Sequence, residues 1–514
     1  MSKTIIIIGA GLAGLSAALQ AAENGCNVKL VSSLPSERAQ SVMAEGGINA
    51  ALNTKDENDS PEEHFTDTIK AACGLADPNA VWGMTQAAPE LVHWLLKLGV
   101  KFNMSGYDDV DLRNFGGQKK KRTAFAQSDT GKQIMTAMID AVRRKEASGM
   151  VERFSHHSFL TLRLCGNICC GCVIRDEYSQ ETVELPGDAV IVATGGMHGL
   201  FGNTTGSLSN TGEVTAELFR LGVPLANGEM IQYHPTTVKC GGKRMLISEA
   251  ARGEGGRLFA MKDGKQWYFM EEKYPELGNL MPRDITAREI WKVSHESEVF
   301  LDMTEISEEI ISNKLSGLAD DCMTYLHKDI RKEPVSVLPG IHYFMGGILV
   351  DEQHRTPIQN LYAAGECCAQ YHGANRLGGN SLLGALYGGR VAAKSACEQA
   401  DVVDLSCATQ IDFPPASQIS EIKQLNKVMQ ETMGVVRNEN TLLKWDKTVQ
   451  ALTGNLPLLG MAVLKSALAR KESRGAHWRE DYPKSNDDDY LKTTVARFDG
   501  KQIQISFVPV PERR

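Results

Sequence analysis

One arginine stands among small residues in the stretch HGANRLGGNSLL at 372–383. Small residues let a backbone and a ligand approach each other closely, and a guanidinium group fits a carboxylate through two parallel hydrogen bonds. The stretch therefore predicts a binding surface in which Arg376 meets an acidic ligand. A Gly-rich loop with a solvated arginine is the alternative that this stretch alone leaves open.

A glycine pattern for phosphate binding lies at the start of the chain. TIIII at 4–8 predicts a buried strand, GAGLAG follows at 9–14, and LSAALQAAENG then predicts a helix. In this context Gly9 makes the turn, Gly11 lets a pyrophosphate reach the helix N-terminus, and Gly14 lets helix and strand pack. The first forty residues therefore predict a dinucleotide-binding unit.

The segments that complete this unit favour FAD. The second strand, CNVKLVSS, ends in Ser32 and Ser33 instead of an acid, and a serine can still bond a ribose hydroxyl. DAVIVATGG at 188–196 and NLYAAGECC at 360–368 predict further buried strands, the latter ending in Glu366, an acid placed to hold a ribose. Neither carries a second complete fingerprint for NADPH. An FAD domain split by an insertion accounts for this order.

Composition and charge indicate which kinds of protein this chain is not. With 514 residues, 42% hydrophobic and 23% charged, the chain has an ordinary globular composition, enough for roughly two to four domains. A net charge of −8 argues against nucleic-acid binding, and KKKR at 119–122 is expected to be a solvated loop. No stretch has the roughly eighteen uncharged apolar residues of a spanning helix, and no signal peptide is evident. We expect a cytoplasmic protein, or one that reaches a membrane through partner subunits.

The twelve cysteines are irregularly spaced and do not describe a disulfide framework. Their one cluster, CGNICCGC at 165–172, matches neither zinc nor iron–sulfur spacing. The flanking stretches FLTLRL and VIRDE predict the two strands of a hairpin. We therefore expect no metal site here. These cysteines are expected to be small buried side chains of the two strands.

Six motifs identify a family that the chain resembles. They are QYHPT at 232–236, SEAARGEGG at 248–256, MPRD at 281–284, HYFMGG at 342–347, HGANRLGGNSLL, and ARKESRGAHWREDYP at 469–483. They occur in the order seen in the flavoprotein subunit of fumarate reductase and succinate dehydrogenase, with L-aspartate oxidase the nearest relative. The resemblance runs from the first glycine motif to about residue 495.

The resemblance implies an α/β fold. It consists of a Rossmann-type FAD-binding domain interrupted by an α+β capping domain and followed by a helical C-terminal domain. The expected bounds are 1–233 and 343–405 for the FAD-binding domain, 234–342 for the capping domain and 406–514 for the C-terminal domain. DFPPAS at 412–417 would be the linker, and Ile419, Ile422, Leu425 and Met429 recur at helical spacing after it.

The resemblance also implies roles for the site residues. Hydride would pass from flavin N5 to fumarate, with Arg283 of MPRD as the proton donor. Glu249 and Arg252, spaced i and i+3, would return a proton to Arg283. The expected contacts of the dicarboxylate are His234, Ser248, Glu249, His342, Arg376 and Phe115. Taken singly, each has a structural alternative, such as a core histidine or a turn arginine; their joint occurrence in order favours the functional interpretation.

The expected cofactor is FAD, held without a covalent bond. Members with a covalent flavin carry a histidine before the A-x-G-G segment, where this chain has Gln40 in RAQSVMAEGG. In the family a covalent bond favours succinate oxidation, so its absence favours fumarate reduction. The expected cofactor contacts are Gly9, Ala10, Gly11, Leu12, Ala13, Gly14, Ser32, Ser33, Met43, Ala44, Glu45, Gly46, Gly47, Ala193, Thr194, Gly195, Glu213, Glu366, Arg376, Ser381 and Leu382.

Three alternatives stay open. L-aspartate oxidases place a glutamate before the GG of the segment that reads RNFGGQ here, and Phe115 at that position favours fumarate over aspartate. Another unsaturated carboxylic acid is a second alternative, and a non-catalytic flavin subunit of an electron-transfer assembly is the third. The chain has no iron–sulfur or C-x-x-C-H haem motif. Its electrons would therefore come from an iron–sulfur partner or a soluble donor.

Overall fold

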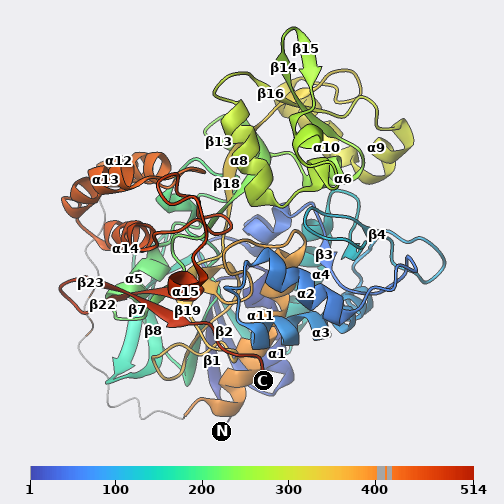
Figure 1. The fold of residues 1–514 in the computed structure, drawn as a ribbon. Helices are drawn as coiled ribbons and strands as arrows, with labels where there is room; N and C mark the ends of the chain where they lie inside the picture. Colours follow the sequence, from blue (N-terminus) through green and yellow to red (C-terminus); the bar gives the residue numbers. More distant parts are fainter. Residues whose placement is uncertain (1, 402–410, 412, 414–418) are drawn as a thin grey trace.

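The computed structural model describes residues 2–401, 411, 413 and 419–514. The expected linker at 412–417 therefore lies outside the described residues except for Phe413, and the expected domain boundary at 405/406 lies wholly outside them. Figure 1 shows a lower body that carries both chain ends, an upper lobe of residues from the middle of the sequence, and a C-terminal group of helices beside them.

A five-stranded parallel sheet forms the centre of the body, in the order β20-β10-β1-β2-β6. Its strands are β1 (Thr4–Ile8), β2 (Asn27–Ser32), β6 (Val151–Ser155), β10 (Ala189–Val192) and β20 (Leu361–Ala363). Ile6 pairs with Val190, and Ile191 pairs with Tyr362. Segments far apart in sequence thus meet in one sheet, which confirms the strands predicted at 4–8, 188–196 and 360–368.

The two faces of β1 are buried against different layers. Alternate residues of a strand point to opposite faces. Ile5 and Ile7 pack with the helices on one side, while Ile6 and Ile8 pack with a three-stranded antiparallel sheet on the other. The helices are α1 (Leu12–Glu23), α3 (Pro78–Leu98), α4 (Thr130–Ala147) and α11 (Asn380–Gln399); the sheet is β7 (His157–Cys165), β8 (Ile168–Asp176) and β9 (Thr182–Pro186). The antiparallel pair β7–β8 confirms the predicted hairpin.

The upper lobe comprises β12, β18 and the residues between them (Figure 1). The strands β12 and β18 pair with each other. Its strands are β12 (Ile231–Cys240), β13 (Lys243–Leu246), β14 (Arg257–Lys262), β15 (Lys265–Trp267), β16 (Val299–Asp302), β17 (Val335–Ser336) and β18 (Leu338–Phe344). Its helices are α6 (Glu249–Gly253), α7 (Phe269–Lys273), α8 (Arg283–Val293), α9 (Glu308–Lys314) and α10 (Ser316–Asp321). The expected boundaries at 233/234 and 342/343 fall inside β12 and β18, so two paired strands connect the lobe to the body.

The C-terminal region combines helices with a β-hairpin. Its elements are α12 (Ile419–Thr432), α13 (Glu439–Gln450), α14 (Asn455–Ala469), α15 (Asp487–Tyr490), β22 (Lys492–Phe498) and β23 (Ile503–Pro509). The hairpin joins a sheet of order β21-β19-β11-β22-β23, with β11 (Leu225–Ala226), β19 (Gly347–Leu349) and β21 (Cys368–Ala369). The sequence prediction of a helical region did not contain this hairpin. Leu425 and Met429 of α12 are buried, whereas Ile419 is 75% exposed.

Shorter elements complete the body: β3 (Ile48–Asn49), β4 (Leu112–Arg113), β5 (Thr123–Ala124), α2 (Pro61–Ala71) and α5 (Glu213–Arg220). Arg122, next to β5, is fully buried and forms ion pairs with Asp59 and Asp67 at 2.8 and 2.9 Å. The expectation that the KKKR run is a solvated loop is therefore wrong for its arginine, because two carboxylates compensate the burial of the charge.

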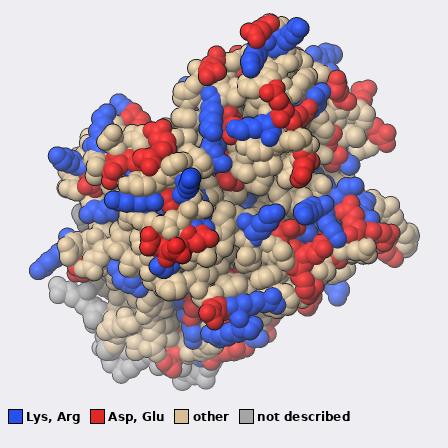
Figure 2. Space-filling model, viewed as in Figure 1, with Lys and Arg blue, Asp and Glu red and all other residues tan. Residues whose placement is uncertain are grey.

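Charged side chains of both signs are interspersed over the face seen in Figure 2. Among the residues that the structure describes, no helix is long and apolar enough to cross a membrane. In the same part of the chain, no group of three or more His, Cys, Asp or Glu side chains could hold a metal ion.

Candidate active site

A cavity of about 350 Å³ lies where the upper lobe meets the body. It is lined by most of the residues singled out in the sequence: Gly9, Ala10, Gly11, Leu12, Ala13, Ser32, Ser33, Gln40, Met43, Ala44, Glu45, Gly46, Gly47, Phe115, Ala193, Thr194, Gly195, Glu213, His234, Ser248, Glu249, Arg283, His342, Glu366, Arg376, Ser381 and Leu382. Gly14 and Arg252 do not belong to this lining. Gly14 packs helix against strand, since a Cβ there would be 1.9 Å from the carbonyl oxygen of Gly9.

Two helix N-termini face the cavity and could hold a phosphate group. The residues Gly11 and Gly379, which cap α1 and α11, give no side-chain cap hydrogen bond. The first backbone N–H of each helix is used, that of Leu12 by Ser41 and that of Asn380 by Leu377, but Ala13 and Ser381 in the same turns line the cavity and could present their N–H groups to an anion. A Cβ on Gly9 would lie 2.3 Å from the carbonyl oxygen of Ala193, so only glycine fits this turn, at φ +110°. The buried hydroxyl of Ser32 has no hydrogen-bond partner among the described residues, as expected of a group that meets a ribose. These features fit FAD.

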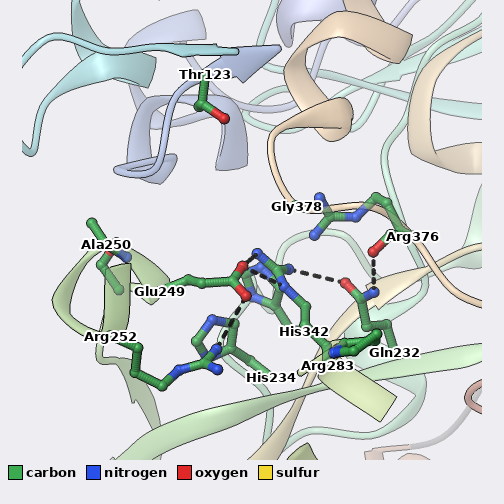
Figure 3. A network of polar contacts seen from close by, with 12 residues as sticks. Thr123, Gln232, His234, Glu249, Ala250, Arg252, Arg283, His342, Arg376 and Gly378 are labelled. Carbon is green, nitrogen blue, oxygen red and sulfur yellow. Dashed lines mark hydrogen bonds and ion pairs between the residues drawn. The ribbon is translucent and has the colours of Figure 1, made fainter. Parts of the chain in front are cut away.

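On the other side of the cavity, one glutamate lies between two arginines (Figure 3). Nε and Nη2 of Arg283 donate to Oε2 of Glu249 at 2.9 and 2.6 Å, and Nη2 of Arg252 donates to Oε1 at 3.1 Å. The spacing of Glu249 and Arg252 on α6 brings their side chains onto one side of the helix. Ser248 caps this helix, its hydroxyl accepting from the backbone N–H of Ala250 at 3.4 Å. The structure therefore brings together the three residues of the expected relay.

Burial shapes the charges of this cluster. Burial alone would raise the pKa of Glu249, but the guanidinium groups of Arg283 and Arg252 hold it below the ordinary value. Burial, and next the charge of Arg283, lowers the pKa of Arg376 to about 9. Glu249 is thus an anion and Arg376 a cation at neutral pH.

Two histidines and Arg376 face the same part of the cavity. The rings of His234 and His342 lie edge to face at 5.1 Å, and Nδ1 of His342 is 2.8 Å from the hydroxyl of Thr205. Burial, and next the charge of Arg283, holds the pKa of both imidazoles well below the usual range, so both are neutral donors or acceptors. The guanidinium of Arg376 lies over the ring of Tyr343 at 4.3 Å.

Several polar atoms in this part of the cavity lack a protein partner. Nε2 of His234 and Nε of Arg376 are buried and have no hydrogen-bond partner within the described part of the chain. Buried polar atoms are normally paired, so such atoms indicate a ligand. Three arginines against one glutamate leave the cluster with an excess of two positive charges. This end of the cavity could therefore hold an anionic ligand.

One residue at the centre of the cluster was missed in the sequence. Nε2 of the buried Gln232 donates to Oδ1 of Asn375 and to the carbonyl oxygen of Arg376, both at 2.9 Å. Its Oε1 accepts from Nη1 of Arg283 at 3.0 Å. Gln232 thus connects the arginine of the lobe to the arginine loop of the body. It stands two residues before His234, so the two-residue period of a strand could have placed both side chains on one face.

Comparisons with known proteins agree with this geometry. Residues 4–382 match a family model for an FAD binding domain, and residues 451–513 match one described as fumarate reductase flavoprotein C-term. The succinate dehydrogenase flavoprotein subunit of Bacillus subtilis is 38% identical over 576 residues, which span 100% of this chain and 98% of that protein. The chain belongs to the succinate dehydrogenase and fumarate reductase flavoprotein family.

Two further relatives support the membership. The 8-methylmenaquinol:fumarate reductase flavoprotein subunit of Wolinella succinogenes is 32% identical, with 100% of this chain and 92% of that protein covered. A solved structure of E. coli quinol fumarate reductase has a TM-score of 0.90 and 27% identity, covering 99% of this chain and 97% of that chain. The flavoprotein is an FAD-dependent oxidoreductase, which confirms the predicted family, the predicted fold class and FAD as the cofactor; its attachment without a covalent bond stays a prediction.

The cavity of this flavoprotein has two walls that suit different ligands. One wall, formed by the glycine loop, Ser32 and the start of α11, suits the cofactor. The other wall presents cations and donors that suit an acid. Because FAD supplies the redox chemistry when bound, the residues of this second wall could serve to bind and orient an acid and to move a proton.

Proposed function

We propose that this flavoprotein reduces fumarate to succinate. The observation that carries the proposal is the excess of two positive charges around buried, unpartnered donors, which matches a dicarboxylate. Arg376, His234 and His342 bind the carboxylates, and Phe115 and Ser248 complete the wall. Negative charge grows on one carboxylate as hydride arrives, so cations aimed there stabilise the transition state more than the ground state.

Arg283 donates the proton to the substrate carbon. A guanidinium is a poor acid, and its neighbours supply what it lacks. Glu249 receives two hydrogen bonds from Arg283 and one from Arg252, so a proton can pass from Arg252 through Glu249 to Arg283 over hydrogen-bonded steps of 2.6 to 3.1 Å. Gln232 keeps the remaining arm of Arg283 in place.

FAD is held without a covalent bond, which favours fumarate reduction over succinate oxidation. Gln40 stands where members with a covalent flavin carry a histidine, and its Oε1 accepts from the backbone N–H of Ser207 at 2.6 Å. An amide has no nucleophilic ring nitrogen to form the bond. Acid precipitation of the purified protein should release all yellow colour into the supernatant; colour retained in the pellet would contradict the proposal.

Electrons reach the flavin from outside the chain. The relatives from Wolinella succinogenes and Bacillus subtilis are named as flavoprotein subunits of larger enzymes. By this likeness we infer an iron–sulfur partner, through which the protein associates with the inner face of a membrane. A soluble electron donor is the alternative.

Turnover assays test the proposal most directly. Purified protein with bound FAD is assayed anaerobically with a reduced artificial dye and fumarate, and separately with succinate, aspartate and several enoates. We expect fumarate to give the highest kcat/KM. Faster oxidation of aspartate would favour an L-aspartate oxidase, and faster reduction of another enoate would change the substrate. Photoreduced protein that fumarate does not reoxidise would make the chain a non-catalytic flavin subunit.

A further inference from the structure

A buried histidine lies behind the cofactor side of the cavity and is not used by the proposed chemistry. His198, in the short helix η3 (His198–Leu200), is fully buried. Its Nε2 lies 3.5 Å from Oε1 of Glu366, in the short helix η6 (Gly365–Cys367) at the cavity wall. Nε2 makes no hydrogen bond to any described residue, so this contact with the carboxylate is its polar interaction on that side. The imidazole thus has one polar neighbour in that direction, and it is a carboxylate that faces the cofactor space.

Two glycines make room for this pair. A Cβ on Gly206 would lie 2.2 Å from Cε1 of His198, and a Cβ on Gly196 would lie 2.7 Å from Oε1 of Glu366. Neither distance is compatible with a side chain unless the pair moves. The ring of His198 also packs edge to face on Phe344 at 5.0 Å, and the backbone N–H of Phe344 donates to Oε1 of Glu366 at 3.1 Å. The fold therefore accommodates this histidine specifically.

The polar neighbours of His198 favour one position for its ring proton. The hydroxyl of Thr204 accepts from the backbone N–H of Gly206 at 3.2 Å and lies 3.1 Å from Nδ1 of His198. A carboxylate can only accept, so the tautomer that suits Glu366 carries the ring proton on Nε2, and Nδ1 then accepts from the hydroxyl of Thr204. The hydroxyl of the next residue, Thr205, donates to the carbonyl oxygen of Ile341 at 3.3 Å and lies 2.8 Å from Nδ1 of His342 on the substrate side.

We propose that His198 is a positioning residue for the cofactor. Its Nε2–H holds the carboxylate of Glu366 in its orientation at the cavity wall and offsets its charge, so that FAD binds tightly and is reduced at a higher potential. This inference rests on the proposed binding of FAD in this cavity. It needs no contact between His198 and the cofactor.

FAD-binding titrations in a double-mutant cycle test the proposal. FAD-free protein is titrated with FAD, and the quenching of flavin fluorescence gives the Kd for wild type, His198→Phe, Glu366→Gln and the double variant. Phenylalanine keeps the ring packing on Phe344 and removes both nitrogens. We expect His198→Phe to raise the Kd about tenfold, the order of effect for loss of one polar contact with a charged group. In the Glu366→Gln background the same change should have little effect.

A purely structural role would give a different result. Loss of packing would raise the Kd by the same factor in both backgrounds, and that result, or an unchanged Kd in His198→Phe, would overturn the proposal. The flavin midpoint potential supplies a second readout: it should become more negative in His198→Phe, because the charge of Glu366 is less offset, and should not change further when His198→Phe is added to Glu366→Gln. If His198→Phe does not fold, His198→Asn completes the cycle, with partial retention of affinity expected because its amide can donate.

A control on the neighbouring threonine separates this inference from the proposed function. Thr205→Val removes the hydroxyl that orients His342, so it should raise the KM for fumarate and leave the Kd for FAD unchanged. A wild-type protein that binds FAD without reducing fumarate would contradict the proposed function and leave the cycle on His198 interpretable. A wild-type protein that does not bind FAD would contradict both.

Discussion

At the scale of single residues, the site depends on buried charges that only each other and a ligand compensate. Glu249 accepts from both Arg283 and Arg252, while Arg376 rests on an aromatic ring and has no carboxylate partner of its own within the described residues. A buried cation without a partner is costly in a folded protein. The cost becomes useful when an anion binds, because the substrate supplies the missing partner.

Replacing Arg283 with lysine should remove nearly all turnover. The ammonium cannot bond Glu249 and Gln232 together as the planar guanidinium does, and loss of a positioned proton donor typically costs about 10²–10⁴-fold in rate. We expect a fall in kcat of about a thousandfold with FAD absorbance unchanged, measured by dye-coupled fumarate reduction. Arg257→Lys, in a half-exposed pair with Glu271, is the matched control and should keep full activity. Wild-type turnover in Arg283→Lys would refute the assignment.

Glu45 should make the stability of the FAD-free protein depend on pH. Burial, and next the neighbouring Asp321, raises the pKa of this carboxyl from 4.5 to about 8. Between these values the folded protein holds a proton that the unfolded chain has lost, so stability falls as pH rises from about 4.5 to 8, by roughly 5 kcal/mol at most. Glu45→Gln does not titrate. We therefore expect the thermal midpoint of the variant to exceed that of wild type by a margin that grows between pH 5 and pH 8; a constant margin would contradict the raised pKa.

At the scale of elements, glycines let three segments meet around Glu249. A Cβ on Gly378, in the arginine loop, would lie 2.8 Å from Oε2 of Glu249 and 3.1 Å from Phe115; one on Gly116 would lie 2.6 Å from Oε1. The small residues that made the HGANRLGGNSLL stretch conspicuous therefore allow the loop before α11 to pack against the relay. The interpretation of this stretch as a close-approach surface agrees with the geometry.

Gly378→Ala should lower the rate of turnover. The added methyl must displace the Glu249 carboxylate or the Phe115 ring, and either shift disturbs the bonds to Arg283. A misplacement of this size can cost about a hundredfold in rate, so we expect kcat for fumarate to fall by one to two orders of magnitude. Gly242→Ala, at a position with no atom within 4 Å and an unstrained backbone, is the matched control. Equal rates in both variants would show that the relay tolerates the displacement.

The elements that the sequence predicted well are those with local signals. The strands β1, β10 and β20 are short apolar runs beside small residues. In the β7–β8 hairpin, apolar and polar residues alternate along β7, and turn residues bound the strands. The C-terminal hairpin also had a signal, since Asp499 and Gly500 lie between the alternating runs of β22 and β23. It was missed because the resemblance to a helical domain took precedence over that pattern.

The site residues that the sequence did not predict depend on contacts between distant segments. Gln232 gains its role only where β12 meets Asn375 and Arg283. His198 depends on space left by Gly206 and on a carboxylate more than a hundred residues away. The burial of Arg122 likewise depends on Asp59 and Asp67, which precede it by fifty or more residues. No local spacing in the sequence identifies such partners.

At the scale of the whole molecule, the site exists only when lobe and body are together. Arg283 and Glu249 come from the lobe, whereas Arg376 and the glycine loop come from the body (Figures 1 and 3). The C-terminal region supports this arrangement through buried ion pairs. Nε of Arg470, at the end of α14, donates to Glu229 of the body at 2.7 Å, and its Nη1 donates to Glu472 at 2.7 Å. Glu229 leads into β12, the strand that carries Gln232 and His234.

Breaking this buried connection should destabilise the whole protein without altering the chemistry of the cavity. Arg470→Leu leaves the fully buried carboxylate of Glu229 without its ion-pair partner, whereas Glu472 keeps Arg474; breaking such a buried pair costs roughly 3–5 kcal/mol. We expect a lower thermal midpoint for the FAD-bound protein, while folded protein at low temperature keeps its KM for fumarate. Adding Glu229→Gln to Arg470→Leu should recover part of the loss, because the double variant buries one unpaired charge fewer. A midpoint equal to that of wild type in Arg470→Leu would mean that the C-terminal region does not hold β12 in place through this pair.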